Sequence, residues 1–557
     1  MTLKVLILGG YGTFGGRLAR LLADEPRVAL LIAGRSLAQA QAFCAALPAK
    51  AALTPVRFDR EGDVEAQLTA LAPDMVVDAS GPFQTYGDLY RVVRAALVRG
   101  INYLDLADGS DFVHGIAQFE AQARERGVFV LAGASSFPVL TAAVTRRLAA
   151  GMRVETITGG IAPSPYAGVG LNVIRAIAGY AGQKVALVRD GRKTFGYGLA
   201  ESRRYTVAPP GCVPLRNIRF SLVDVPDLQV LPDLWPGLRA IWMGAGPVPE
   251  ILHRVLNACA WLVRLRLVRS LAPLAPLMHW ATNVLRWGEH RGGMFVEVAG
   301  EAEGARFTRS WHMIAEADDG PLIPSMACEA IIRHCLDGAP PAPGARAAVG
   351  DLELDDYEKL FARRAIVTGR REATPRTPAL PLYRRLLGEA YASLPAPLQA
   401  LHDLNGDMTA EGTATVTRGT SSLARFAAAV IGFPQAGENV PVRVDFKIEN
   451  GRERWTRTFA GRSFHSTQEQ GRGRYEWLVC ERFGPLKAGM ALLVDDGKLR
   501  LVVRRWSLFG IPLPLRLAPR GDSYEYAEDG RFHFHVEIGH PLTGPIVAYR
   551  GWLVLRA

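Results

Sequence analysis

The 557-residue sequence predicts a multidomain α/β fold that is followed by a β-rich C-terminal domain. Three observations support this prediction. An apolar run ends in a glycine-rich segment near the N-terminus, strand-like and helix-like stretches alternate through the middle, and strand signals dominate after a proline-containing stretch at 370–381. At roughly 100–200 residues per domain, the length favours about three domains, each able to bury a core.

The first strand and the turn after it predict a dinucleotide-binding domain of the Rossmann type. Leu3–Leu8 is an apolar run, typical of a strand buried on both faces of a parallel sheet. Gly10, Gly12 and Gly15 then give the pattern G-x-G-x-x-G, and a segment with helical spacing follows. These glycines permit a tight turn, close approach of a pyrophosphate and close helix–strand packing; the alternative is a structural glycine turn. The predicted pyrophosphate site comprises Gly9, Gly10, Tyr11, Gly12, Thr13, Phe14 and Gly15.

The second predicted strand, 28–33, bears on the choice of cofactor. An NAD-selective site usually has an acidic residue at the end of this strand, where it binds the ribose hydroxyls. This chain has Arg35 and Ser36 there instead. An arginine suits a 2′-phosphate through its charge and forked donors, and the serine adds a hydroxyl. The sequence therefore predicts NADP(H) in preference to NAD(H), unless Arg35 is a solvated loop residue.

Two further turns extend the predicted cofactor site. A third strand, 54–58, ends at Asp59, which either approaches the adenine or caps the helix beginning near Asp63. A fourth strand, 74–79, leads into a turn that we expect near the nicotinamide ribose, at the carboxyl edge of the sheet. The residues of this turn in the predicted site are Ser80, Gly81, Pro82 and Phe83.

The candidate catalytic residues follow the next strand, at the same edge of the sheet. They are Tyr103, Asp105 and Asp108, and one of them could donate a proton or orient the substrate. Alternatively, Asp105 caps the next helix and Tyr103 belongs to the core. The sequence has no Ser-His-Asp spacing, GxSxG, HExxH or CxxC pattern. Hydride transfer, with the reactive atom supplied by the nicotinamide, is the chemistry that the sequence favours.

Several segments together resemble the saccharopine dehydrogenase-like oxidoreductases over roughly residues 1–370. The matching segments are 9–16, 33–36, 81–83 with Tyr86-Gly87, 100–106, 293–300 and 320–324. The resemblance implies a Rossmann domain, a second α/β domain inserted before its last elements, and a nicotinamide cofactor, but no particular substrate. Ala107-Asp108-Gly109 departs from the family's commoner Thr-Gly-Glu, which weakens any transfer of amino-acid substrate contacts.

The predicted domains follow from these patterns. Residues 1–150 form the Rossmann domain, 151–370 a second α/β domain for substrate or dimerisation that returns to the Rossmann core, 371–381 a linker, and 382–557 a β-rich domain. Strand signals in the last domain are separated by turns such as Asp496-Gly497 and Asp529-Gly530. This spacing predicts an antiparallel sheet or barrel.

The C-terminal region resembles a bacterial domain of unknown function that is often fused behind saccharopine dehydrogenase-like domains. The resemblance rests on Leu394-Pro395, Leu401-His402, 540–544 and 549–552, and it implies no activity. A closed β-structure of this size could hold an apolar ligand. His533 and His535 share one face of a strand near His540, but satisfied or solvated histidines are commoner than ligands, so we predict no metal.

Residues 255–287 combine tryptophans, leucines and arginines. The arginines and two prolines, Pro273 and Pro276, interrupt any run of about 20 apolar residues, which disfavours a membrane-spanning helix. Three alternatives remain: a core helix pair, a homodimer face, or a surface that contacts a membrane peripherally. The last alternative would imply a lipid-like substrate.

Composition excludes other classes of function. The net charge of +11 is spread over the chain, with no basic block, which argues against nucleic-acid binding. None of the six cysteines forms a CxxC pair, so we expect reduced thiols and no cysteine-bound zinc. The apolar run Leu3–Leu8 is too short for a secretory signal. We therefore expect a cytoplasmic protein, membrane-associated if residues 255–287 contact lipid.

The sequence thus predicts an NAD(P)-dependent oxidoreductase that acts on a small or lipid-like substrate. The alternative is a non-catalytic protein that senses the cofactor or binds an apolar ligand, peripheral at a membrane.

Overall fold

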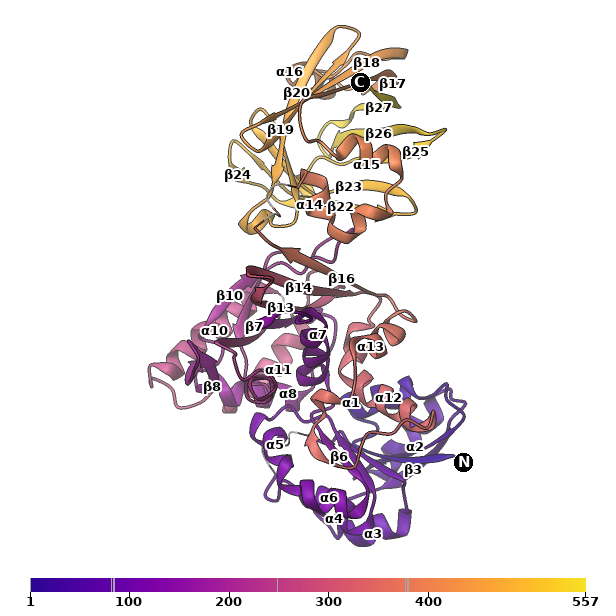
Figure 1. Ribbon diagram of the computed structural model, residues 1–557, viewed down its shortest axis with the longest axis vertical. Helices are drawn as coiled ribbons and strands as arrows, with labels where there is room; N and C mark the ends of the chain where they lie inside the picture. The colour runs from indigo at the N-terminus through magenta and orange to yellow at the C-terminus, as the bar shows by residue number, and fades with distance from the viewer. Residues whose placement is uncertain are drawn as a thin grey trace. The chain divides into compact units, whose positions relative to one another are not determined.

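The computed structural model describes residues 2–81, 83, 86–247, 249–375, 377 and 380–556. The chain forms two compact units (Figure 1). Unit 1 comprises Met1–Arg204 and Ile218–Val367, and unit 2 comprises Tyr205–Asn217 and Thr368–Ala557.

Unit 1 begins with a parallel seven-stranded sheet in the order β15-β6-β5-β4-β1-β2-β3. β1 lies between β4 and β2 and pairs in parallel with both, so the chain reverses its direction of winding there. Ligands of such sheets bind outside the carboxyl ends of the strands at this switch point. The strands are β1 (Leu3–Leu8), β2 (Val28–Gly34), β3 (Ala52–Arg57), β4 (Met75–Asp78), β5 (Asn102–Asp105), β6 (Phe129–Ala132) and β15 (Gly344–Ala347).

The helices between these strands begin at recognisable caps. Ser36 accepts a hydrogen bond from the Gln39 backbone N–H at 3.3 Å, and Asp63 accepts one from Ala66 at 2.9 Å. Asp63 rather than Asp59 therefore caps the third helix. The helices are α1 (Thr13–Leu21), α2 (Leu37–Ala46), α3 (Val64–Leu71), α4 (Arg91–Arg99), α5 (Ser110–Gly115) and α6 (Glu120–Arg126).

A later part of the chain returns to this sheet. Helix α12 (Ile323–Leu336) packs against α1, where the Ser325 hydroxyl donates to the Phe14 carbonyl at 3.1 Å. Arg333 on the same helix pairs with Asp24 at 2.8 Å. β15 then pairs in parallel with β6. Segments about 300 residues apart in sequence therefore share one core.

The second sheet of the fold is mixed, in the order β10-β11-β12-β7-β13-β14-β16. β7 runs parallel to β12 and antiparallel to β13. Its strands are β7 (Arg153–Ala162), β10 (Ser202–Tyr205), β11 (Ile218–Leu222), β12 (Ala240–Ala245), β13 (Gly292–Ala302), β14 (Ala305–Ala315) and β16 (Ile366–Ala373). The accompanying elements are α7 (Thr141–Leu148), α8 (Leu171–Tyr180), the hairpin of β8 (Lys184–Arg189) and β9 (Arg192–Tyr197), α9 (Asp227–Leu234), α10 (Glu250–Arg264), α11 (Ala275–Val284) and α13 (Leu354–Phe361).

Unit 2 is an antiparallel barrel, and its described residues include the α-helices α14 (Leu382–Leu387), α15 (Ala396–His402) and α16 (Ser422–Ile431). Ten strands close on themselves because β22 pairs with both β21 and β23, and the short β24 adds to β23. The strands are β17 (Met408–Arg418), β18 (Gly437–Glu449), β19 (Arg452–Phe459), β20 (Arg462–Gln470), β21 (Val479–Phe483), β22 (Leu486–Asp495), β23 (Lys498–Leu508), β24 (Ile511–Pro512), β25 (Ser523–Glu528), β26 (Arg531–His540) and β27 (Gly544–Arg556). The structure thus confirms the predicted fold class, and the C-terminal alternative that it adopts is the barrel.

A segment from the middle of the sequence, Tyr205–Asn217, belongs to unit 2. The Val494 N–H donates to the Gly211 carbonyl at 2.9 Å, and Arg371 Nε donates to the Ala208 carbonyl at 2.7 Å. β16 extends to Ala373, so it includes the first residues of the segment expected as a linker. No pattern in the sequence indicates that residues 205–217 pack against the C-terminal domain.

Candidate functional site

A cavity of about 600 Å³ lies in unit 1 at the carboxyl ends of β1 and β4, the switch point of the parallel sheet. Most of the predicted cofactor residues line it. They are Gly9, Tyr11, Gly12, Thr13, Phe14, Arg35, Asp59, Ser80, Gly81 and Phe83, together with the predicted catalytic residue Asp108. Gly10, Gly15, Ser36, Tyr103 and Asp105 do not line it, and Pro82 lies outside the described residues.

The glycine loop leaves no room for side chains behind its inner surface. A Cβ on Gly15 would collide with the Gly9 carbonyl oxygen, and a Cβ on Gly10 would lie 2.8 Å from the Ile7 carbonyl oxygen. Gly12 is the N-cap of α1 and has no side-chain cap. The first turn of α1 therefore presents free N–H groups to the cavity, the arrangement that binds a phosphate anion.

At the end of β2, Arg35 stands exposed on the cavity wall. Among the described residues, its side chain has no hydrogen-bond or ion-pair partner, so its charge is available to an anion. The Tyr11 hydroxyl accepts a hydrogen bond from the Ser36 N–H at 3.1 Å, which fixes the loop. The Ser36 hydroxyl caps α2 instead of facing the cavity.

A buried arginine that the sequence analysis missed lies beside Asp59. Arg60 pairs with the fully buried Asp78 and donates to the Ser80 hydroxyl at 3.1 Å, and its guanidinium lies 3.8 Å from the centroid of the Tyr86 ring. Asp59 itself accepts a hydrogen bond from the Glu61 N–H at 3.0 Å. In the sequence, the position of Asp78 at the end of an apolar strand could have indicated a partner such as Arg60, because a buried carboxylate requires a cation or hydrogen-bond donors.

The opposite end of the cavity is closed by the second domain of unit 1. Residues 170–173, at the start of α8, line the wall, and Asn172 Nδ2 donates to the Gly81 carbonyl at 2.8 Å. The Tyr86 hydroxyl donates to the Ser80 carbonyl at 2.7 Å. The turn after β4 is therefore held from two sides, by α8 and by Tyr86.

The three candidate catalytic residues have different surroundings. Asp108 lines the cavity, whereas Tyr103 and Asp105 are fully buried behind it. Asp105 Oδ1 accepts hydrogen bonds from the N–H groups of Gly133 and Ala107 at 2.7 and 3.0 Å, and burial raises its pKa to about 7. Burial and the neighbouring Asp105 raise the pKa of Tyr103. Asp105 does not cap the next helix, because Gly109 is the N-cap of α5.

A second group of titratable residues lies near Asp108. The Ser110 hydroxyl donates to Asp224 Oδ1 at 2.8 Å, and burial raises the pKa of Asp224. Burial also raises the pKa of Tyr180, with contributions from Asp224 and Asp108. Perturbed titratable groups beside a cleft are typical of functional sites. Sequence reasoning missed Asp224 and Tyr180 because they lie far from the glycine motif along the chain.

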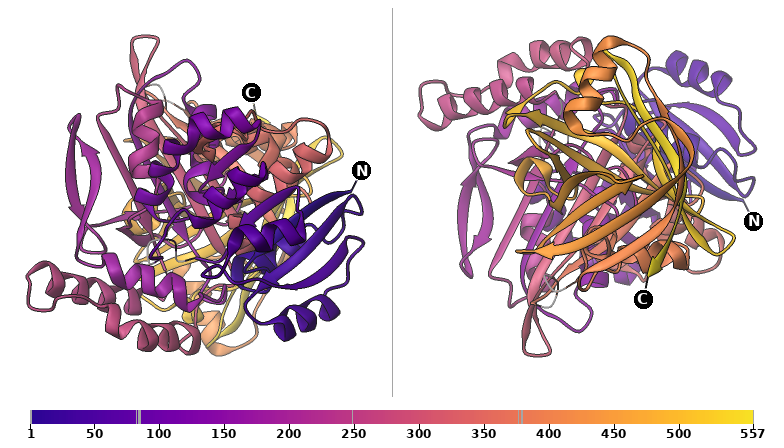
Figure 2. Two further views of the ribbon diagram at one scale, coloured as in Figure 1. Left: turned by 90° about the horizontal axis from the view of Figure 1, so that it is seen from below. Right: turned by 90° about the horizontal axis from the view of Figure 1, so that it is seen from above.

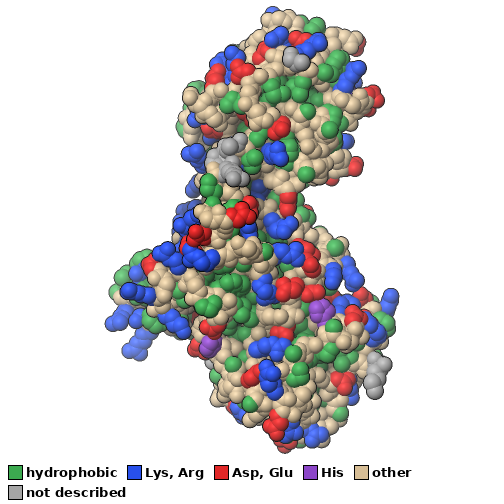
Figure 3. Space-filling view, viewed as in Figure 1, with side chains coloured by type: hydrophobic (Ala, Val, Ile, Leu, Met, Phe, Trp, Pro, Cys, Tyr) green, Lys and Arg blue, Asp and Glu red, His purple; other side chains and the backbone are tan. Residues whose placement is uncertain are grey.

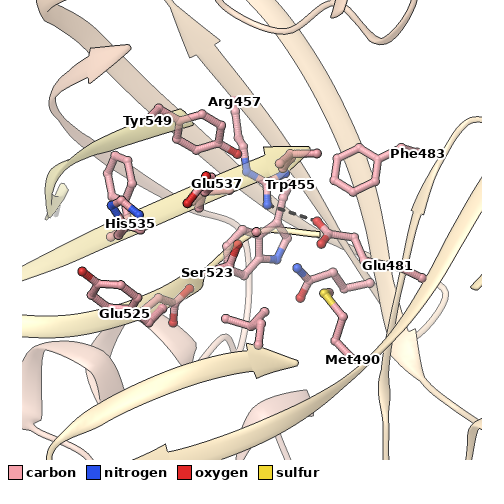
Figure 4. A pocket seen from close by; sticks show the side chains of 18 of the residues that line it. Trp455, Arg457, Glu481, Phe483, Met490, Ser523, Glu525, His535, Glu537 and Tyr549 are labelled. Carbon is pink, nitrogen blue, oxygen red and sulfur yellow. Dashed lines mark hydrogen bonds and ion pairs between the residues drawn. The ribbon is translucent and has the colours of Figure 1, made fainter. Parts of the chain in front are cut away.

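The barrel of unit 2 encloses a different cavity, of about 190 Å³ (Figure 4). Its wall consists mainly of aliphatic and aromatic side chains, such as Phe433, Val444 and Met490. Inside it, Arg457 pairs with Glu481 at 3.2 Å, and Ser466 Oγ accepts from Arg457 at 2.8 Å and donates to Glu481 at 2.6 Å.

One residue of the C-terminal motifs lines this cavity, and another is buried against two residues of its wall. The Tyr549 ring lines the cavity beside Arg457 (Figure 4), and burial raises the pKa of its hydroxyl to about 12. The fully buried His402 bonds through Nε2 to Glu525 at 2.6 Å, and its ring stacks on Tyr383 at 3.8 Å between centroids.

The histidines considered as metal ligands are in contact with aromatic rings. The ring of His533 lies 5.1 Å from Tyr526, that of His535 lies 5.0 Å from Tyr524, and that of His540 lies 6.1 Å from Trp506. Among the described residues, no group of three or more His, Cys, Asp or Glu side chains gathers in a way that could hold a metal ion. All six cysteines are free thiols.

Residues 394–553 match the model of a family described as a domain of unknown function, DUF4166. This match confirms the resemblance of the C-terminal region to a domain of unknown function. No curated protein matches the chain.

Solved structures of several dehydrogenases are similar to part of the chain. An amine dehydrogenase from Mycobacterium smegmatis has 13% identity and a TM-score of 0.32, covering 62% of this chain and 94% of that one. A myo-inositol dehydrogenase from Corynebacterium glutamicum has 13% identity and a TM-score of 0.32, covering 66% and 99%. A dehydrogenase from Clostridium difficile has 9% identity and a TM-score of 0.31, covering 65% and 98%. At these TM-scores the similarity supports no conclusion about function.

Proposed function

We propose that the protein is an NAD(P)-dependent oxidoreductase of the saccharopine dehydrogenase-like type, with NADP(H) as the preferred cofactor. Its substrate would be a small or lipid-like molecule that accepts or gives up a hydride. The observation that carries the proposal is the glycine loop at the switch point of a parallel sheet, where Gly15 and Gly10 have no space for a Cβ and a cavity of about 600 Å³ opens in front.

The residues present fit a nicotinamide dinucleotide. The N–H groups of Thr13 and Phe14, in the first turn of α1, would hold the pyrophosphate, and Arg35 would bind the 2′-phosphate. The cavity volume falls within the range of roughly 300–1,000 Å³ that small-molecule and cofactor sites occupy. When bound, the nicotinamide supplies the hydride chemistry.

The chain's own residues would manage the proton that accompanies the hydride. Asp108 lines the cavity and is the candidate that can reach a substrate atom directly. Tyr180 and Asp224 lie close enough to Asp108 to alter each other's ionisation, and burial favours the protonated form of both. Asn172 would close the site from α8 through its hydrogen bond to Gly81.

Titration of the purified protein with NADPH and NADH, followed by fluorescence, tests this proposal. We expect NADPH to bind at least tenfold more tightly, because a 2′-phosphate gains a charge-assisted contact with Arg35. Arg35→Ala should remove this preference and leave NADH binding within twofold. Arg99→Ala, at an exposed arginine on α4, is the matched control. Failure of both nucleotides to bind would overturn the oxidoreductase proposal, and equal affinities would overturn the preference for NADP(H).

The barrel cavity favours a second candidate function for unit 2, the binding of a small apolar molecule with one hydrogen-bonding group. A dry apolar cavity of about 150 Å³ is known to bind benzene, so about 190 Å³ suits a molecule of roughly ten non-hydrogen atoms. The Arg457–Glu481 pair leaves the interior without net charge at this point. Arg457 has donors beyond the two that it uses, and the Tyr549 hydroxyl keeps its proton at neutral pH.

Calorimetric titration with benzyl alcohol and toluene tests this second function. We expect benzyl alcohol to bind more tightly than toluene, because its hydroxyl can pair with Tyr549 or Arg457. Tyr549→Phe should weaken the alcohol about fivefold and leave toluene unchanged, and Ala488→Phe should block both by filling the cavity. NADPH affinity is the control, since it reports on unit 1. Binding of either compound that survives Ala488→Phe would refute the assignment to the barrel.

A further inference from the structure

We propose that residues 251–288, called here the α10–α11 segment, form a docking surface for an anionic lipid membrane. Of the 27 exposed large hydrophobic side chains in the described residues, 13 lie in this segment. Single exposed apolar residues are ordinary, but a contiguous apolar surface on a water-soluble unit marks an interaction site. The 13 residues are Ile251, Val255, Trp261, Leu262, Leu265, Leu267, Val268, Leu274, Leu277, Trp280, Val284, Leu285 and Trp287.

α10 has two apolar faces, and one of them packs against the rest of unit 1. His253, Ala260 and Val263 are buried, and Asn257 Nδ2 donates to the Leu199 carbonyl at 2.7 Å and to the Ser221 hydroxyl at 2.9 Å. This face anchors the helix.

The other face of α10 is exposed in the described part of unit 1. Ile251, Val255 and Leu262 recur at helical spacing, and they are 59%, 56% and 42% exposed. Leu277, Trp280 and Val284 form a similar exposed row on α11. The two rows exclude the alternative that this segment is a core helix pair.

The charge of the segment identifies the partner. It contains five arginines, Arg254, Arg264, Arg266, Arg269 and Arg286, and no acidic residue between Glu250 and Glu289. Two of the arginines, Arg266 and Arg269, lie with Leu265 and Leu267 in the turn after α10. This turn is at the projecting edge of unit 1 (Figure 2), and hydrophobic and basic side chains lie side by side on that edge in Figure 3. Basic residues beside leucines and tryptophans suit the headgroup region of an anionic bilayer.

Charge also argues against a second copy of the chain as the occupant. Arg254 pairs with Glu250 at 2.7 Å, but Arg264, Arg266, Arg269 and Arg286 have no acidic residue within the segment. A two-fold contact places the same surface on both sides, so it would bring these four arginines together without acidic partners from the segment. Exposed tryptophans such as Trp261 and Trp280 favour the membrane interface, where an amphipathic ring is stable. No helix among the described residues is long and apolar enough to cross a membrane. The segment would therefore lie in the plane of the interface.

Flotation of the full-length protein with lipid vesicles tests this inference. We expect binding to vesicles of phosphatidylcholine with about 30% phosphatidylglycerol, a probe composition whose negatively charged surface attracts basic segments. Binding to phosphatidylcholine alone should be at least tenfold weaker. Leu265→Asp with Leu267→Asp should reduce binding to the anionic vesicles at least tenfold. Val98→Asp, at an exposed valine on α4, is the matched apolar control and should have no effect.

Charge reversal provides a second variant with its own control. Arg266→Glu with Arg269→Glu should abolish the preference for anionic vesicles, whereas Arg99→Glu with Arg126→Glu makes the same change in net charge at exposed sites elsewhere and should preserve it. Retained NADPH binding shows that the variants fold. Absence of vesicle binding overturns the inference, as does a dimer, measured by sedimentation, that Leu265→Asp with Leu267→Asp dissociates.

Discussion

The cavity of unit 1 and the cavity of the barrel have walls of different kinds. The first is bounded by backbone at the glycine loop and by side chains such as Arg35 that remain exposed. The second is enclosed by apolar side chains around an internal ion pair, Arg457–Glu481. A site built from backbone requires particular glycines, so it leaves a motif in the sequence. A site built from side chains on many strands leaves none.

The two units also contain buried carboxylates in different surroundings. Glu481 has a cation at 3.2 Å. Asp105 has two backbone N–H donors and no cation in direct contact among the described residues, and burial raises its pKa to about 7. Both units therefore contain a charge pair, Arg457–Glu481 in the barrel and Arg60–Asp78 in unit 1. Unit 1 has in addition Asp105, an acid that holds its proton near neutral pH.

The largest effect is expected from Gly15→Val. The added side chain would collide with the Gly9 carbonyl and displace the loop, so NADPH binding should weaken at least a thousandfold, or about 4 kcal/mol. Fluorescence titration measures this loss. Binding of benzyl alcohol to the barrel should stay unchanged. A parallel loss of both ligands would mean that the variant disrupts the whole chain and does not act on one cavity.

Glu481→Gln should destabilise the barrel by about 3 kcal/mol, because it leaves the Arg457 guanidinium, whose side chain is 13% exposed, without its counter-charge. Hydrogen exchange of peptides from β19 and β21 measures this change within unit 2. The double variant Arg457→Met, Glu481→Leu removes both charges and should recover most of the loss. If exchange in β19 and β21 were as slow in Glu481→Gln as in the parent protein, the pair would not be buried as the structure describes.

Asp105→Asn should change the pH dependence of stability by about 2 kcal/mol between pH 5 and pH 8. The folded-state pKa, about 7, lies above the ordinary value of about 3.9, so Asp105 favours folding at low pH and this contribution is lost as pH rises through 7. The variant lacks this loss, so its free energy of unfolding should increase relative to that of the parent protein as pH rises. Denaturant unfolding of both proteins at pH 5 and pH 8 measures the difference between their unfolding free energies. Asp227, also buried with a pKa raised to about 7, is common to both proteins and cancels. A constant difference would show that Asp105 is ionised throughout.

The smallest effect is expected from Ser36→Ala, about 1 kcal/mol of stability, because the hydroxyl caps α2. NADPH affinity should change less than twofold, since Ser36 does not line the cavity. Thermal unfolding and nucleotide titration measure the two quantities. A tenfold loss of NADPH affinity would instead favour the role in the cofactor site that the sequence predicts for Ser36.

Sequence reasoning was most successful where local chemistry alone defines a structure. The glycine loop, the strands that flank it and the hairpin turns at Asp496 and Asp529 could be predicted because each depends on neighbouring residues. Arg60, Asp224 and Tyr180 could not be found in this way. Each acquires its significance from residues on other elements: Arg60 from Asp78, Asp224 from Ser110, and Tyr180 from Asp108.

The amino-acid sequence by itself determined the class of the fold and the position of the glycine loop, because periodicity and glycine spacing are local properties of the chain. It also marked residues 255–287 as unusual, but left three explanations open. Only the tertiary structure decided that α10 buries one apolar face and exposes the other, and that β22 closes the barrel by pairing with β23. These outcomes depend on contacts between residues distant in sequence, and such contacts form only when the whole chain has folded.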